Sequence, residues 1–252
     1  MREPHDLKAR DPHLATLAAK SATDNPVVLD LGCGTGSTIR ALKPYLPENT
    51  KWRLVDNDPV LLSLAKNEAG FDTEAFLLDL GDIESLPLEG ATLVTGSALL
   101  DLVSRKWLED LAALLEVPTY FALSYDGQMS WQPESELDAE ITSSFNSHQR
   151  SDKGFGPALG PDAASTASEI FSALGFEVSL ARSPWQLASE DKALHDELIA
   201  GIAEAAMQAG APMAKSWALA KLSEGFSNCV IGHADIVALP GSTLLGSSDA
   251  QY

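Results

Sequence analysis

Three glycines alternate with other residues in the stretch 27–36, whose sequence is VVLDLGCGTG. Glycine tolerates positive φ angles and leaves the backbone open to a bound molecule, so Gly32, Gly34 and Gly36 could form a turn that holds a ligand. An apolar run precedes this turn and a helix-compatible run follows it. The N–H groups at the start of a helix attract anionic or polar groups. The stretch therefore predicts a nucleotide-like cofactor site, with Asp30 beside it.

Two more acids end apolar segments further along the chain. Asp56 follows 52–55, and Asp79 follows 74–78. Asp56 could cap the next helix, but Asp58 stands directly before a proline and is better placed as the cap. Asp58 as the cap leaves Asp56 free for another role. Asp79 could be a turn acid, and its importance depends on its register with the other strands.

The spacing of the glycines distinguishes two classes of cofactor. The dinucleotide fingerprint is G-x-G-x-x-G, with an acid about 20 residues later. Here Ser37 stands where that fingerprint has its third glycine, and Asp30 precedes the first one. A sulfonium cofactor carries no phosphate but has an ammonium group, which gains from a nearby carboxylate. The pattern D-x-G-x-G-x-G therefore favours a sulfonium cofactor.

This stretch resembles the first motif of class I S-adenosylmethionine-dependent methyltransferases, and the likeness extends over 27–127. The resemblance implies S-adenosylmethionine as cofactor. It also implies that Asp56 grips the ribose hydroxyls, that Asp79 and Leu80 meet the adenine, and that the segment 96–101 lines the methyl-transfer point. The cofactor-binding residues expected from the resemblance are Asp30, Gly32, Cys33, Gly34, Gly36, Asp56, Asn57, Asp79, Leu80 and Ser97. One departure is that about 36 helical residues separate the last two strands, which the family usually joins by a tight hairpin.

Three residues are candidates for a general base, which is needed only if the acceptor loses a proton during transfer. Asp101 lies in an apolar run just past the fourth strand, where it could also be a plain helix N-terminal acid. Tyr125 follows the fifth strand, and His148 lies in a later polar segment. Asp126, next to Tyr125, is a candidate for contact with the substrate.

A Gly/Pro-rich segment, 146–157, carries Arg150 and Lys153, and no other Lys or Arg lies between Lys106 and Arg182. We interpret this segment as a lid whose two cations bind an anionic substrate, because Arg suits carboxylate and phosphate groups. The alternative is a solvated loop whose cations pair with the acids of 134–140.

Strand-like and helix-like segments alternate up to residue 124, which is typical of a doubly wound parallel sheet. The predicted strands of this part are 27–29, 52–55, 74–78, 91–95 and 120–124. The later chain is predicted as helices 134–146, 162–174 and 189–224 and strands 176–180 and 229–239. We expect an α/β fold with a mostly parallel seven-stranded sheet, helices on both faces and helical insertions near the C-terminal half. These segments predict a single domain over 1–240, with a loose start at 1–10 and a disordered tail at 241–252. Two insertions are expected within the domain, a lid-like one at 128–161 and a helical one at 188–225.

Charge and cysteine content narrow the partners. The net charge is −19, with 17 Lys and Arg against 36 Asp and Glu in 252 residues. A chain this acidic repels nucleic acids and anionic membrane surfaces, so we expect neither as a partner. Cys33 and Cys229 are the only cysteines, and no leader or membrane-spanning run is apparent, which predicts a cytoplasmic protein. No His or Cys has metal-ligand spacing, so we expect no metal. The oligomeric state is left open.

The function that fits these features is transfer of a methyl group from S-adenosylmethionine to a small acceptor, anionic if the lid interpretation holds, by in-line displacement. Two alternatives stay open. One is an NAD-dependent oxidoreductase, which Ser37 and the lack of a Tyr-x-x-x-Lys set disfavour. The other is a non-catalytic binding subunit with a methyltransferase fold, since the acids report binding and not chemistry.

Overall fold

The computed structural model describes residues 2–70 and 72–241. Its strands are β1 (Val27–Leu31), β2 (Lys51–Asp56), β3 (Thr73–Leu77), β4 (Leu93–Ser97), β5 (Thr119–Gln132), β6 (Phe176–Arg182), β7 (Trp185–Ala188) and β8 (Asn228–Pro240). Its α-helices are α1 (Glu3–Ala9), α2 (Pro12–Ser21), α3 (Ser37–Leu42), α4 (Pro59–Ala69), α5 (Arg105–Leu114), α6 (Asp138–Gln149), α7 (Ala163–Ala173), α8 (Lys192–Gln208) and α9 (Ala214–Glu224). Short 3-10 turns are η1 (Ile83–Ser85), η2 (Gly160–Asp162) and η3 (Ser189–Asp191). The tail predicted at 241–252 lies outside the described residues, apart from Gly241.

All these strands form one sheet with the order β3-β2-β1-β4-β5-β8-β6, and β7 also pairs with β8. The pairs from β3 to β5 are parallel, whereas β8 runs antiparallel to β5, β6 and β7. The prediction of a mostly parallel doubly wound sheet is therefore confirmed. The short β7 adds an eighth strand to the seven expected.

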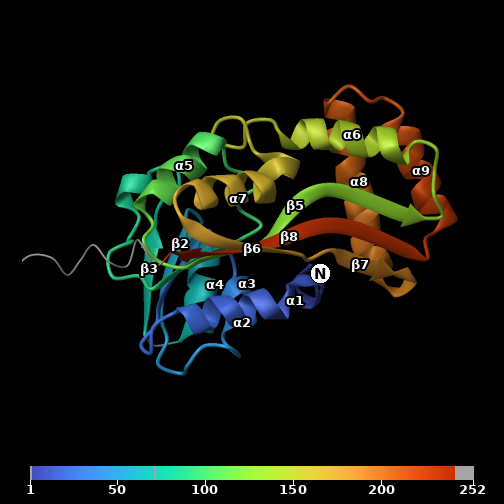
Figure 1. The fold of residues 1–252 in the computed structure, drawn as a ribbon. Helices are drawn as coiled ribbons and strands as arrows, with labels where there is room; N and C mark the ends of the chain where they lie inside the picture. The colour runs from blue at the N-terminus through green and yellow to red at the C-terminus, as the bar shows by residue number, and fades with distance from the viewer. Residues whose placement is uncertain (1, 71, 242–252) are drawn as a thin grey trace, which may run out of the picture.

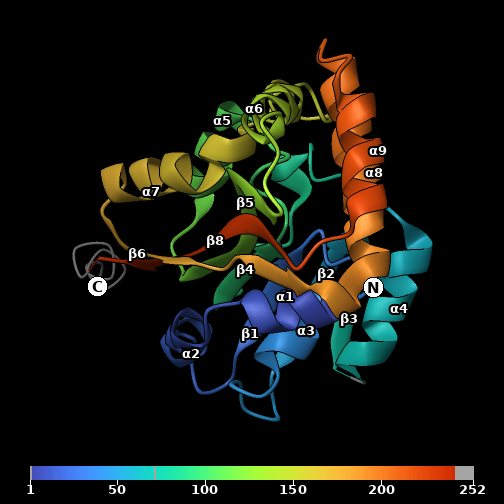
Figure 2. The ribbon, with the colours of Figure 1, turned by 90° about the vertical axis from the view of Figure 1, so that its right-hand side faces the viewer.

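Helices cover both faces of the sheet, as Figures 1 and 2 show. The alternation along β1 explains the two layers, because successive side chains of a strand point to opposite faces. Leu29 and Leu31 pack with apolar side chains of α5 and α7, whereas Val28 packs with those of α2, α3 and α4. Asp30 has the same parity as Val28, so its side chain points to the second face at the carboxyl end of the strand.

Several helices begin where the sequence supplies a cap. Asp11 Oδ1 accepts a hydrogen bond from Leu14 N at 2.8 Å, and Asp58 Oδ1 accepts from Val60 N at 2.7 Å. A proline follows each of these acids as the first helical residue. Such caps stabilise a helix by about 1 kcal/mol, because they satisfy N–H groups that have no partner inside it. Asp58 thus caps α4, which leaves Asp56 free for the site.

The greatest departure from expectation is an arm built on β5 and β8. The two strands pair from Thr119↔Ala238 to Gln132↔Asn228, well beyond the parallel part of the sheet. Helices α6, α8 and α9 and strand β7 pack around the far half of this pair in an apolar cluster of their own (Figure 1). The insertion predicted at 128–161 is therefore wrong at its start, because residues 128–132 continue β5. Alternating apolar residues such as Met129 and Trp131 carry the strand onward.

The long helical segment between β7 and the last strand does not interrupt the antiparallel edge of the sheet. β6 and β7 lie one after the other along β8, from Phe176↔Pro240 to Ala188↔Asn228. Between them, Ser183 N donates to His233 O at 2.8 Å, which keeps the two strands in line. The helical segment 192–224 leaves only after β7 and returns directly into β8.

The N-terminal segment predicted to be loose forms α1, which bridges the two parts of the molecule. Arg2 Nη2 donates to Glu197 Oε1 of α8 at 3.0 Å, and Trp185 Nε1 of β7 donates to Asp6 Oδ1 at 3.0 Å. Glu3 pairs with Arg40 of α3, on the other side. These contacts order a polar helix whose own composition gives little apolar surface to bury.

Candidate functional site

The glycine-rich turn leaves β1 at its carboxyl end and leads into α3. Gly32, Gly34 and Gly36 have φ angles of +65°, +53° and +87°, in the left-handed region that favours glycine. A Cβ atom on Gly34 would meet nothing within 4 Å, whereas one on Gly36 would lie 3.1 Å from Ile39. Gly36 is therefore needed for packing, and Gly34 leaves an open surface that a ligand can approach. Cys33 contributes backbone, since its N–H donates to Val55 O at 3.0 Å.

Asp56 lies directly against this turn. Its Oδ2 accepts from Gly34 N at 2.8 Å, and its Oδ1 accepts from Asp58 N at 3.0 Å. The side chain is buried, whereas the neighbouring Asn57 is exposed. Each carboxylate oxygen can accept a second hydrogen bond, so Asp56 can still receive the two hydroxyls of a ribose.

Asp30 is completely buried between the turn and β4. Thr95 Oγ1 donates to Asp30 Oδ1 at 2.9 Å. Burial raises the pKa of Asp30 to about 7, and the positive charge of Arg10 works against this rise. An anionic Asp30 would therefore be favoured by a cationic group placed beside it, such as the ammonium of an amino acid.

Arg10 is a candidate site residue that the sequence analysis left in the loose start at 1–10. It lies between α1 and α2 with an exposed fraction of 6%, and its Nη2 donates to Ser97 Oγ at the end of β4 at 2.8 Å. Its Nε and Nη1 make no hydrogen bond with the described residues. A buried guanidinium with two free donors suits a carboxylate. The only signal in the sequence was the Asp11 cap, which fixes where α2 begins but not where Arg10 points.

Asp79 and Leu80 follow β3 and lie at the neighbouring edge. Asp79 is exposed and accepts from Gly81 N at 2.8 Å, which orders the turn. Leu80 is buried, and its carbonyl accepts from Trp107 Nε1 at 2.6 Å. The contact of both residues with adenine, which the resemblance implies, stays a prediction.

A cavity of about 430 Å³ opens beyond the carboxyl end of β4, beside the part of β5 that follows its parallel pairing with β4. Asp101 and Tyr125 both line it, together with Ala98 and Leu123. Asp101 has an exposed fraction of 8%, its Oδ1 makes no hydrogen bond with the described residues, and burial raises its pKa to about 6. The hydroxyl of Tyr125 donates to Asn146 Oδ1 at 2.8 Å, and burial raises the pKa of that hydroxyl.

The backbone is strained where it enters this cavity. Ala98 and Leu123 have φ angles of +49° and +57°, and they are the non-glycine residues with positive φ in the described part of the chain. Leu123 lies at an irregularity of the β5–β8 pairing, and its N–H donates to Asp235 Oδ1 at 2.9 Å. Strain of this kind collects at functional sites, where the surroundings hold it in place.

Comparison with known proteins matches residues 28–117 to the model of a methyltransferase domain. The chain carries a methyltransferase domain. The match spans the glycine turn, Asp56, Asp79 and the segment after β4, so the resemblance noted from the sequence is confirmed. The enzyme class is that of the class I methyltransferases, whose cofactor is S-adenosylmethionine.

Solved structures agree on the fold of this methyltransferase. The YcgJ protein of Bacillus subtilis aligns with a TM-score of 0.55 at 13% identity, over 91% of this chain and 99% of that one. A candidate methyltransferase of Bacillus halodurans C-125 aligns with a TM-score of 0.57 at 14% identity, over 92% and 99% of the two chains. A search of curated proteins finds no match. At such identities these neighbours report the fold alone.

The methyltransferase does not bring His148, Arg150 or Lys153 into the cavity beside Asp101. His148 faces α8, where its Nε2 lies 3.0 Å from Gln208 Oε1. Arg150 is 46% exposed and pairs with Asp162 Oδ2 at 2.9 Å. Lys153 belongs to the loop 152–157, whose Phe155 packs edge-on against Trp107. The segment expected as a lid is therefore divided, since 146–149 end α6 and Phe155 packs on α5. Among the described residues, the ion pairs include none between its two cations and the acids of 134–140, and Arg150 pairs with Asp162 instead.

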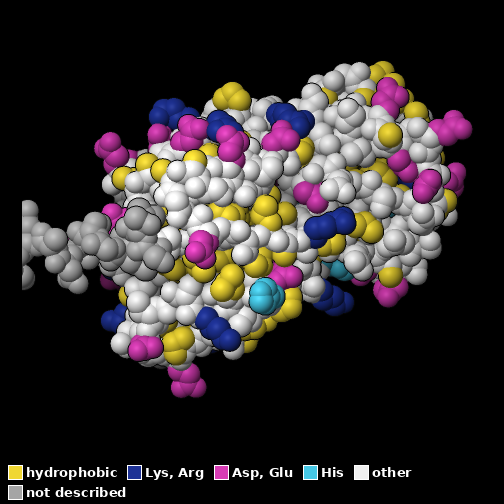
Figure 3. All heavy atoms as spheres, in the orientation of Figure 1, with side chains coloured by type: hydrophobic (Ala, Val, Ile, Leu, Met, Phe, Trp, Pro, Cys, Tyr) yellow, Lys and Arg dark blue, Asp and Glu magenta, His cyan; other side chains and the backbone are white. Residues whose placement is uncertain are grey.

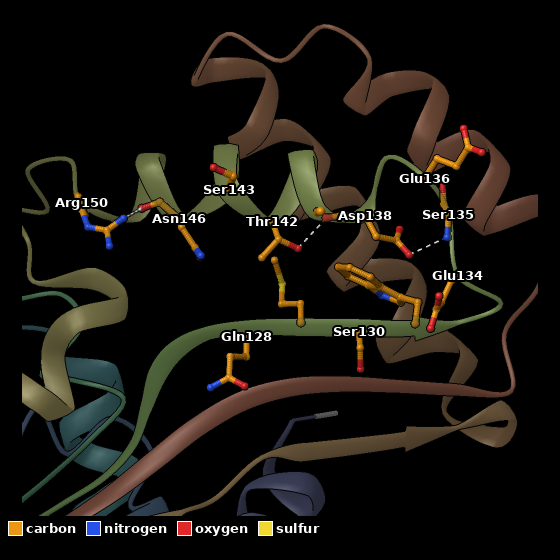
Figure 4. A pocket seen from close by; sticks show the side chains of 13 residues that line it. Gln128, Ser130, Glu134, Ser135, Glu136, Asp138, Thr142, Ser143, Asn146 and Arg150 are labelled. Atoms are coloured by element: carbon orange, nitrogen blue, oxygen red, sulfur yellow. Dashed lines mark hydrogen bonds between the residues drawn. The ribbon is translucent and has the colours of Figure 1, made fainter.

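Arg150 instead borders a second, open groove of about 830 Å³ between α6 and the arm. Figure 4 shows Arg150 at one end of this groove and Glu134 and Glu136 at the other, with Thr142 and Asn146 pointing from α6 toward β5. The groove has polar walls on both sides. The groove shares only Met129 with the lining of the cavity at Asp101.

Asp126 packs over the backbone of β8 and turns away from the predicted substrate contact. Its Oδ1 accepts from Gln128 N at 2.9 Å, and a Cβ on Gly232 would lie only 2.0 Å from that oxygen. Within residues 2–70 and 72–241, His, Cys, Asp and Glu form no group of three or more that could hold a metal ion. The expected absence of a metal stays a prediction.

Proposed function

We propose that this methyltransferase transfers a methyl group to a small-molecule acceptor held in the cavity at Asp101. The observation that carries the proposal is the position of this cavity, directly past the carboxyl end of β4 and beside the part of β5 that follows its parallel pairing. Open α/β sheets bind ligands at the carboxyl edge of their parallel strands. A volume of about 430 Å³ suits a small molecule.

The residues present fit the cofactor. Gly34 offers an open surface, Asp56 can receive the ribose hydroxyls, and Asp30 can favour the ammonium group. Arg10, with two free buried donors, can hold the carboxylate at the other end of the amino acid portion. The cofactor supplies a methyl group on a sulfonium centre, which already carries its own leaving group.

The task of the protein is then alignment and exclusion of water. A displacement at carbon requires the attacking atom, the methyl carbon and the leaving sulfur in line, and holding them so removes much of the entropic barrier. The α1 helix supports this arrangement, because its pairs to α3 and α8 fasten it across the side of the site. Apolar walls from α6 and α8 limit the entry of water.

Among the three predicted bases, Asp101 is the one that the cavity favours. Its free Oδ1 is buried, and its raised pKa of about 6 suits proton transfer near neutral pH. Tyr125 keeps its proton, since its pKa is raised, and so it serves better to orient the acceptor. His148 faces α8 and belongs to helix packing.

Surface charge supports a small acceptor over a nucleic acid. On the face shown in Figure 3, Lys and Arg side chains lie scattered among Asp and Glu side chains without a continuous basic surface. Binding of a phosphate backbone depends on such cations. No helix among the described residues is long and apolar enough to cross a membrane. Cys33 and Cys229 are free and buried, which supports a cytoplasmic location.

Calorimetric titration with S-adenosylmethionine, S-adenosylhomocysteine and NAD tests the cofactor side of the proposal. We expect the two sulfur cofactors to bind and NAD not to bind. Asp56→Ala should weaken binding at least about tenfold, because it removes hydrogen bonds to a charged group worth about 1.5–3 kcal/mol. Asp58→Ala is the matched control, since it weakens the α4 cap and leaves the ribose position alone. Unchanged affinity in Asp56→Ala, or binding of NAD alone, would refute the proposal.

A further inference from the structure

The cavity at Asp101 has a composition that narrows its ligand further. Most of its wall is apolar and comes from segments far apart in the chain: Met129 of β5, Phe145 of α6, Trp185 of β7 and Ile202 of α8. Its volume of about 430 Å³ lies at the low end of small-molecule pockets, which run from about 300 to 1,000 Å³. The body of the ligand must therefore be compact and apolar.

The charged groups on the wall are mostly acids. Asp6, Asp101 and Glu197 line the cavity together with a single cation, Arg2. Arg2 is bound to Glu197 at 3.0 Å, and both side chains are about half exposed. The positive charge at the mouth is thus compensated. An anion inside the cavity would face Asp6 and Asp101 without a free cation among the lining residues.

The remaining polar groups of the wall supply no charge that would help an anion. Burial lowers the pKa of His233 to about 4, so its ring is neutral at neutral pH. The Tyr125 hydroxyl already donates to Asn146, and Asp6 already accepts from Trp185. Asp101 Oδ1 is left as a buried acceptor without a donor. An unsatisfied buried acceptor costs about 1–3 kcal/mol, and a donor on the ligand would remove that cost.

We propose that the acceptor in this reaction is a small neutral or cationic molecule with an apolar body, whose nucleophilic N–H or O–H group donates to Asp101. This inference rests on the methyl-transfer function proposed above. It replaces the anionic acceptor expected from Arg150 and Lys153, neither of which lines the cavity.

The transfer step balances for both kinds of nucleophile. An amine that binds in its protonated form first passes one N–H proton to the Asp101 carboxylate and from there to solvent. The lone pair of the neutral amine then forms the new N–C bond while the C–S bond breaks, and the electron pair of the C–S bond stays on sulfur. The product ammonium then passes one N–H proton to the Asp101 carboxylate and from there to solvent. For a hydroxyl group, the O–H proton passes to Asp101 as the O–C bond forms. In either case Asp101 touches the nucleophile and directs its lone pair.

Three probes that share a 2-phenylethyl group test the proposal: 2-phenylethylamine, 2-phenylethanol and 3-phenylpropionate. Their binding to the full chain, saturated with S-adenosylhomocysteine, is measured by saturation-transfer NMR. We expect the amine and the alcohol to bind at least about tenfold more tightly than the propionate, the factor that one charge-assisted hydrogen bond supplies. Asp101→Asn should lower the affinity for the amine about tenfold and should not lower the affinity for the propionate. Glu204→Gln, which removes an exposed acid from α8, should change neither.

Tightest binding by the propionate, equal or absent binding of all three, or an unchanged amine affinity in Asp101→Asn would overturn the inference. Calorimetry on the same sample separates this failure from that of the proposed function. If S-adenosylhomocysteine binds and the selectivity is reversed, the acceptor class is wrong and methyl transfer stands. If S-adenosylhomocysteine does not bind, both proposals fall together.

Discussion

Arg10 gives the sharpest test of how the cofactor is held. Its side chain is 6% exposed, Nη2 is fixed by Ser97, and Nε and Nη1 are free. We expect these two donors to hold the carboxylate of S-adenosylmethionine. Arg10→Met keeps an unbranched, flexible stem, although a shorter one, and removes every donor.

The expected loss follows from the two donors. A hydrogen bond to a charged group contributes about 1.5–3 kcal/mol, and each 1.4 kcal/mol is a factor of ten in affinity. Loss of the two hydrogen bonds to one carboxylate should therefore lower the affinity for S-adenosylmethionine by about 100-fold. Because 5′-methylthioadenosine has no carboxylate, its affinity should change little.

The assay is calorimetric titration of both ligands against wild type, Arg10→Met and Lys8→Met. Lys8 is exposed on α1, two residues before Arg10, and serves as the matched control. An equal loss for both ligands would mean that Arg10 only supports the fold of the site. Unchanged binding of S-adenosylmethionine would mean that the carboxylate lies elsewhere. Either result refutes the assignment.

Two further predictions concern stability. Burial raises the pKa of Asp30 from 3.8 to about 7, so between these values the folded state keeps a proton that the unfolded state has lost. The free energy of unfolding of the ligand-free protein should therefore fall as the pH rises from about 4 to 7, by up to about 4 kcal/mol from this group. Asp30→Asn should flatten the corresponding fall in Tm. If Tm falls with pH as steeply in Asp30→Asn as in the wild type, Asp30 is not the group responsible. Gly232→Ala places a Cβ 2.0 Å from Asp126 Oδ1 and must break the bond of that oxygen to Gln128 N. We expect the free energy of unfolding, measured with urea, to fall by about 1–3 kcal/mol. Adding Asp126→Ala in a double variant should restore most of this loss. An equal loss in the single and the double variant would show that the contact with Asp126 is not responsible.

The sequence predicted the parallel part of the sheet and the turn at its edge well. The glycine turn, Asp56 and the cap at Asp58 are local patterns, and parallel strands bring their carboxyl ends to one edge whatever lies between them. A short apolar run followed by a turn and a helix is almost sufficient to predict a strand–turn–helix unit. The register of β1 with β2 and β4 then places Asp30 and Asp56 beside the turn.

The sequence predicted the acceptor side poorly. Arg150 and Lys153 stood out as the lone cations of a long segment, but a surface cation takes the nearest available acid, and for Arg150 that acid is Asp162. Arg10 was set aside with a polar N-terminus that has few apolar residues of its own. Its burial comes from contacts of α1 with α3, β7 and α8, which no local pattern encodes.

By itself, then, the sequence determined the doubly wound sheet and the cofactor edge, because both follow from hydrophobic period and from residues a few positions apart. Only the tertiary structure decided the acceptor cavity. Its wall combines α1, the extended β5 and β8, α6 and α8, which are brought together by the arm and its own apolar cluster. The charge of that wall depends on which cations are paired and which acid is left alone, and pairing between distant segments is settled only when the chain is folded.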